Sequence, residues 1–258
     1  MKTYFSFFLF LSCVRLASTK VFTADVDARS SRLPRNVPND ALTPLSQLHV
    51  ASKIFSRFAN TLVTSVMENK SPNNKEAKFT VQLPQTAFIS NFSMVVDGKL
   101  YIGVVKERNA AREEYEKAKN KSLNTGLVSQ KPSESPVRGM DVFHISMNVA
   151  PNSSVEFRLN YQQLLERRKG YYEQVISVRP KQIVPILKVV IDIEEPQTLS
   201  YVDVMEIRKD PSDALVKDNP LAMKRETSPK SMHIEYSPSE DDQKKQGVGG
   251  VSGDFIVR

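Results

Sequence analysis

Apolar and polar residues alternate over much of the chain from residue 52 onward, which is the pattern of strands that bury one face. Phe79, Val81 and Leu83, for example, share one face, with polar residues between them. We expect further strands over 62–67, 92–96, 100–104, 143–149, 155–161, 173–178, 187–193, 201–207 and 232–236. Many short strands of this kind predict an all-β fold, specifically a β-sandwich.

Two turn sequences separate neighbouring alternating runs, and each predicts a hairpin. Asp97-Gly98 is suited to a two-residue turn because glycine readily adopts the positive φ that such a turn requires. Pro151-Asn152-Ser153 stands between the runs 143–149 and 155–161. We therefore expect each pair of runs to form an antiparallel hairpin.

The strand pattern is interrupted at several places. Residues 107–119 (ERNAAREEYEKAK) follow the helical period and predict one amphipathic helix against the sheets. We expect exposed loops over 120–138 and 210–231, and a linker over the glycine-rich and charged residues 238–253. Residues 254–258 resemble the start of another strand, and because the sequence stops there we expect a fragment or a short form of a longer protein.

The first nineteen residues have the composition of a secretory signal. Met1-Lys2 is positively charged, residues 3–14 are almost entirely apolar, and Ala17-Ser18-Thr19 supplies small residues for cleavage. A membrane anchor needs roughly 20 apolar residues, whereas this run ends at Arg15. We therefore expect residues 1–19 to be removed and the protein to be secreted into the extracellular space.

Residues 20–45 are polar, contain three prolines and predict a flexible N-terminal segment. R-x-x-R sequences at 29–32 and 32–35 would suit a processing protease of the secretory pathway. The segment is therefore either a short propeptide or a basic tail in which this spacing arises by chance.

Residue composition argues against an enzyme. The single cysteine, Cys13, lies in the predicted signal, so the mature chain has no thiol for a disulfide, a nucleophile or a metal site. His49, His144 and His233 are scattered without the spacing of metal ligands. Phosphate-binding glycine loops, serine nucleophile elbows and H-E-x-x-H motifs do not occur. We expect no catalytic residue, no metal and no cofactor.

Four N-x-S sequences become candidate glycosylation sites in a secreted chain. We rank Asn152 and Asn120 first, because one lies in a predicted turn and the other at the end of the predicted helix. Asn91 alternates opposite Phe92 and should face solvent. Asn69 ranks last, because a proline follows its sequon.

Basic charge suggests a second kind of site. The net charge is +7, of which Lys2 and Arg15 contribute two, so removing the signal leaves +5. The densest basic run is Arg167-Arg168-Lys169, before Gly170. It is either a solvated loop or a contact for a polyanion such as a glycosaminoglycan.

Several strings, in matching order and spacing, are similar to the N-terminal region of the inter-alpha-trypsin inhibitor heavy chains. They include Ala87–Met94 (AFISNFSM), Tyr161–Arg168 (YQQLLERR), Val178–Gln182 (VRPKQ) and Gly253–Arg258 (GDFIVR). The resemblance begins near Leu45 and reaches the end of the sequence. It implies a vault/inter-alpha-trypsin (VIT) domain over 46–178, which is a β-rich module with one helix. A β-rich extension over 179–237 would follow it.

The resemblance also implies a function. Members of that family continue into a von Willebrand factor type A domain with a metal-dependent adhesion site. They then reach an Asp-Pro-His sequence whose aspartate becomes linked to chondroitin sulfate or hyaluronan. Both are missing from this sequence, and Asp210-Pro211 precedes Ser212, so no linkage residue is carried over.

The expected partners are those of the family. They are hyaluronan or a chondroitin sulfate proteoglycan, and a Kunitz-type light chain that carries the protease-inhibitor activity. We expect no nucleic acid partner and no membrane span. The alternative hypothesis is a stand-alone secreted β-sandwich that binds acidic glycosaminoglycans.

Overall fold

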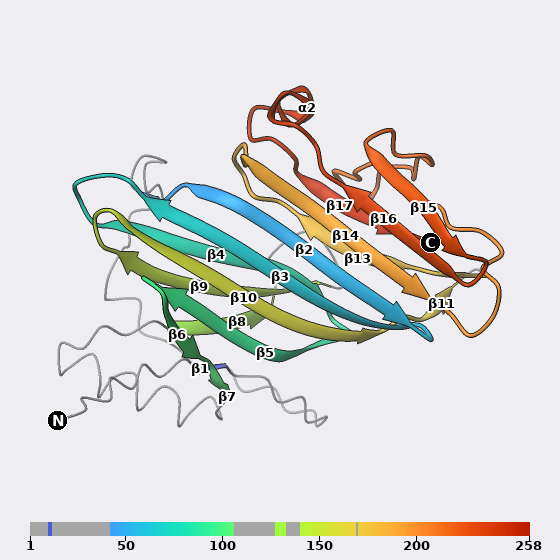
Figure 1. The fold of residues 1–258 in the computed structure, drawn as a ribbon, viewed down its shortest axis with the longest axis horizontal. Helices are drawn as coiled ribbons and strands as arrows, with labels where there is room; N and C mark the ends of the chain where they lie inside the picture. The colour runs from blue at the N-terminus through green and yellow to red at the C-terminus, as the bar shows by residue number, and fades with distance from the viewer. Residues whose placement is uncertain (1–9, 12–41, 106–126, 133–139, 169) are drawn as a thin grey trace, which may run out of the picture.

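A computed structural model describes residues 10–11, 42–105, 127–132, 140–168 and 170–258 (Figure 1). Strands dominate this part of the chain, and the largest sheet has eight of them. In spatial order they are β15 (Ala222–Ser228), β16 (Ser231–Tyr236), β14 (Ile186–Glu194), β2 (Leu45–Phe55), β3 (Phe58–Asn69), β10 (Ser153–Leu164), β5 (Ala87–Val96) and β6 (Lys99–Ile102). Neighbouring strands are antiparallel except β14 and β2, which are parallel.

Shorter sheets cover one face of this large sheet. One consists of β4 (Lys75–Pro84), β9 (Met140–Val149) and β8 (Leu127–Pro132), and another pairs β13 (Gln174–Val178) with β17 (Gly253–Val257). Two minor pairs complete the described strands: β11 (Arg167–Arg168) with β12 (Tyr171–Tyr172), and β1 (Phe10–Leu11) with β7 (Val104–Val105). We refer to β4, β9, β8, β13 and β17 as the second layer.

Aromatic side chains from the two layers meet in the core. Phe79 of β4 and Phe157 of β10 stack with ring centroids 5.2 Å apart, and Phe92 of β5 lies 5.3 Å from Phe143 of β9. All four rings are buried, because the alternation along each strand directs them to the same interlayer space. The structure therefore confirms the prediction of an all-β fold.

One predicted hairpin is confirmed and the other is wrong. β5 and β6 pair across Asp97 and Gly98, whose φ values of 47° and 78° are those of a primed hairpin turn. β9 and β10 form at the predicted residues but do not pair with each other. β9 lies between β4 and β8, whereas β10 lies between β3 and β5. The Pro151–Ser153 turn therefore connects the two layers of the sandwich.

The region after residue 178 is more ordered than its composition suggests. The predicted linker 238–253 contains helix α2 (Glu240–Gln246), which begins at the N-cap Ser239 and buries Gln243. The predicted loop 210–231 contains the edge strand β15, and 201–207 forms isolated bridges rather than a strand. The amphipathic helix expected over 107–119 lies outside the described residues, as do most of the predicted signal and N-terminal segment.

The predicted β-rich extension belongs to the same sandwich. β15, β16 and β14 are neighbouring strands of the large sheet, and β14 lies between β16 and β2 (Figure 1). β17, which follows the predicted extension and linker, pairs with β13 in the second layer. Ile191 and Tyr236 of the extension, together with Phe255 of β17, belong to the common hydrophobic core. α2 joins this arrangement through Gln243, whose side-chain amide bonds both the N–H and the C=O of Val184, at 3.0 and 2.8 Å.

Candidate functional site

The structure places three of the four candidate glycosylation sites. Asn152 lies exposed in the turn before β10 with a φ of 54°. Asn91 is also exposed, on the face of β5 opposite the buried Phe92. Asn120 lies outside the described residues. The accessible amides of Asn152 and Asn91 leave room for a glycan, so both remain candidates.

Asn69 lies in a different environment, at the end of β3. Its side-chain nitrogen donates to the carbonyl oxygens of Asn73, Val149 and Ala150 at 2.8–3.0 Å, and the residue is 1% exposed. A glycan on this nitrogen would displace these hydrogen bonds and has no space in the folded protein. The carbonyl partners at 149 and 150 are distant in sequence, so the sequon alone gives no sign of this burial.

The predicted polyanion contact lies partly within the described structure. Arg167 and Arg168 form β11, which pairs with β12 across a turn in which Gly170 has a φ of 90°. The Arg167 side chain is exposed, and its Nε donates to the Gly170 carbonyl at 3.4 Å. For Arg168 the structure describes the backbone, and Lys169 lies outside the described residues. Of the three predicted residues, Arg167 is therefore the one whose side chain the structure shows to be accessible.

The three histidines are far from forming a common site. His144 bridges the hydroxyls of Thr80 and Ser146 at 2.9 and 3.0 Å, and His233 contacts Asp192 at 2.7 Å. Burial and the neighbouring Lys188 lower the pKa of His49. Within the described ranges, no three His, Cys, Asp or Glu side chains converge as metal ligands.

A buried ion network that the sequence analysis did not predict joins β17 to its neighbours. Asp254 is fully buried, and its carboxylate forms ion pairs with Arg179 and with Arg208, the latter at 3.1 Å. The backbones of Arg208 and Asp254 also exchange two hydrogen bonds, of 2.8 and 3.0 Å. An aspartate in the otherwise apolar strand GDFIV was the available sequence signal, because a buried carboxylate requires cationic partners.

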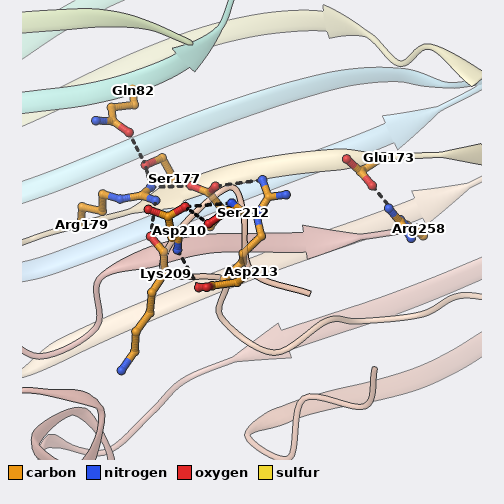
Figure 2. A network of polar contacts seen from close by, with 11 residues as sticks. Gln82, Glu173, Ser177, Arg179, Lys209, Asp210, Ser212, Asp213 and Arg258 are labelled. Carbon is orange, nitrogen blue, oxygen red and sulfur yellow. Dashed lines mark hydrogen bonds and ion pairs between the residues drawn. The ribbon is translucent and has the colours of Figure 1, made fainter. Parts of the chain in front are cut away.

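Further polar contacts extend from Arg179 to the hydroxyl of Ser177 and to the carbonyl of Lys209 (Figure 2). Ser177 on β13 donates to Gln82 on β4 at 3.1 Å, which links the two sheets of the second layer. In the loop after Arg208, the hydroxyl and the backbone N–H of Ser212 both donate hydrogen bonds to the Asp210 carboxylate. These hydrogen bonds lower the pKa of the Asp210 carboxyl. The buried carboxylate of Asp254 has two cationic partners from different segments of the chain, so the geometry of the network favours a role in holding these segments together.

Comparison with known proteins identifies the family. Residues 45–161 match the model of the vault protein inter-alpha-trypsin domain. The chain is 38% identical over 231 residues to human inter-alpha-trypsin inhibitor heavy chain H3, covering 87% of this chain and 24% of that protein. It is 37% identical over 216 residues to human heavy chain H4, covering 82% of this chain and 22% of the relative.

The protein thus contains a VIT domain on an all-β scaffold. It belongs to the inter-alpha-trypsin inhibitor heavy chain family, as the sequence strings indicated. The chain spans about a quarter of the length of the relatives that it matches. Among solved structures, an M1 zinc metallopeptidase from Deinococcus radiodurans aligns at 8% identity with a TM-score of 0.32, covering 83% of this chain and 41% of that one. A similarity this distant supports no argument about function.

No helix in the described part of the chain is both long and apolar enough to cross a membrane.

Proposed function

We propose that this chain is the VIT-bearing part of a secreted, non-enzymatic heavy chain. In this proposal, it acts in hyaluronan-rich extracellular matrix and in complexes with a Kunitz-type protease inhibitor. The observation that carries the proposal is the 38% identity to heavy chain H3 over 87% of this chain. The N-terminal residues 1–19, with their positive, apolar and small-residue parts, support secretion.

Expression of the full chain in mammalian cells tests secretion and modification together. We expect the protein in the medium, with an electrophoretic mobility that increases after enzymatic removal of N-linked glycans. Asn152→Gln should abolish one glycan, whereas Asn73→Gln, an exposed asparagine outside any sequon, should change nothing. Retention of an unglycosylated chain in the cytosol would contradict the proposal.

Association with the matrix has its own test. Medium from hyaluronan-producing cells would be separated by size, and the chain located before and after hyaluronidase or chondroitinase digestion. We expect part of the chain in high-mass fractions and its release by one of the two enzymes. An elution position that neither enzyme changes would argue against a role in these complexes.

Direct binding of an acidic glycosaminoglycan is the second candidate function. Two exposed arginines, Arg167 and Arg57, favour it. Arg57 lies in the turn after β2, and its carbonyl accepts a hydrogen bond from the backbone N–H of Leu165 at 2.8 Å, which places this turn beside the segment that leads to Arg167. Retention on heparin should weaken steeply with salt and decrease in Arg167→Ala. Arg225→Ala, on the edge strand β15, is the matched control. Elution in the void volume at low salt would eliminate this candidate.

A further inference from the structure

A cavity of about 420 Å³ lies between the two layers, beside β4, and opens to solvent at one end. Its wall is apolar where it is deepest. Val50, Val63, Met67, Phe79 and Ile176 line it and are at most 5% exposed. This volume falls within the range of small-molecule binding sites, which are typically apolar cavities with a few polar groups.

The outer end of the cavity is polar and positively charged. Lys78, Thr80 and Lys181 line it and are exposed or half-buried. Lys78 forms an ion pair with Glu76 at 3.2 Å, whereas Lys181 has no ion pair or hydrogen bond to any side chain that the structure describes. Arg179 also lines the cavity, but its charge is already paired with the buried carboxylate of Asp254, and no Asp or Glu is among the described lining residues. Lys181 therefore makes this end of the cavity positively charged, which suits an anion.

Hydrogen-bond donors are also available at this end. Thr43 lines the cavity and is 3% exposed, and its hydroxyl has no partner among the described residues. The Glu76 carbonyl accepts from the Thr43 N–H at 2.9 Å, on the side of β4 that faces away from β9. Backbone groups point to the same side at every second residue, so the N–H groups of Lys78 and Thr80 face that side too. No described strand pairs with β4 there.

We propose that this cavity binds one long-chain fatty acid or a closely similar amphiphile with an anionic head. The alkyl chain would pack against the buried wall formed by Val50, Val63 and Ile176. The carboxylate would lie at the outer end, where it accepts hydrogen bonds from Lys181 and Thr43. This inference does not depend on the proposed role in the matrix, because it rests on the cavity alone.

Competition between ligands of equal chain length tests the chemistry. The purified, delipidated full chain would be titrated with the fluorescent fatty acid cis-parinaric acid, below its micelle-forming concentration. We expect saturable binding of one molecule per chain. Myristate should displace the probe, whereas tetradecanol and tetradecyltrimethylammonium should compete at least tenfold less well, since they lack the anionic head. Absence of saturable binding, or equal competition by all three compounds, would overturn the proposal.

Variants locate the binding site. Val63→Trp should fill the cavity and abolish binding, whereas Leu62→Trp, its neighbour on the outer face of β3, should bind normally. Lys181→Ala should weaken binding about tenfold, which is what one charge-assisted hydrogen bond contributes. Lys230→Ala, an exposed lysine outside the cavity, is its control. Because Lys181 is exposed, its variant remains informative even if Val63→Trp fails to fold. Unchanged binding in Lys181→Ala and in a folded Val63→Trp would place the ligand elsewhere and refute the site.

Discussion

At the scale of single residues, the buried carboxylate of Asp254 has the clearest consequence. Asp254→Asn would leave Arg179 and Arg208, which are only 17% and 19% exposed, without their counter-charge. We expect the free energy of unfolding, measured in urea, to fall by about 3 kcal/mol, as when one partner of a buried ion pair is removed. Asp241→Asn, in an exposed pair with Lys244, should have no measurable effect. Equal stability of the two variants would show that the network contributes nothing.

Burial raises the pKa of Tyr161 to about 12, against the opposing effect of a hydrogen bond with Thr61. An unfolded tyrosine loses its proton near pH 10. Between pH 10 and 12 the folded chain therefore holds a proton that the unfolded chain has lost, and stability must fall as the pH rises. Tyr161→Phe should reduce this fall by about 2–3 kcal/mol in unfolding experiments across that range. Tyr172→Phe, an exposed control, should keep the wild-type slope, and identical slopes in all three proteins would contradict the assignment.

The sequence predicts a candidate site only where a local motif marks it. It identified the Asn152 and Asn91 sequons on exposed positions, because a turn and a strand face can be recognised from neighbouring residues. It could not show that the Asn69 amide is bound by the carbonyls of Val149 and Ala150, since that contact depends on how distant strands meet. The ion-pair partners of Asp254 could not be predicted for the same reason, because Arg179 and Arg208 are distant from it in sequence.

At the scale of elements, β17 depends on a close approach of backbone to backbone. A Cβ atom on Gly253 would lie 2.5 Å from the Ile207 side chain and 2.6 Å from the Arg208 carbonyl oxygen. Gly253→Ala must therefore displace the 207–208 segment, and we expect a loss of about 1–3 kcal/mol in thermal or urea unfolding. Gly249→Ala is the matched control, because its nearest contact would be an ordinary 3.5 Å. A Gly253→Ala protein as stable as this control would mean that the two segments are not packed so closely.

Alternation along a strand predicts which face is buried, but not which strand lies next to it. It therefore gave the positions of β4, β5 and β10 while wrongly pairing β9 with β10. The parallel contact between β14 and β2 joins residues far apart in the sequence, and nothing in either strand's pattern specifies it. α2 was read as linker because it is short and charged. Its one buried anchor, Gln243, is polar, so it gives no apolar periodicity.

At the scale of the whole molecule, the folded unit is larger than the region that matches the VIT family model. That match ends at residue 161, yet β14 is an inner strand of the large sheet beside β2, and β17 pairs with β13 in the second layer. Residues beyond 178 thus supply part of the same core, including Ile191 and Phe255, rather than forming a separate appendage. We infer that both regions form one cooperative sandwich.

Native-state hydrogen exchange of the full chain measures whether the two regions unfold as one cooperative unit. If the two regions unfold together, the slowest amides of β14 and β17 should share an opening free energy with those of β3 and β10, within about 1 kcal/mol. Opening of β14 and β17 at a much lower free energy, while β3 and β10 stay protected, would contradict a single cooperative sandwich.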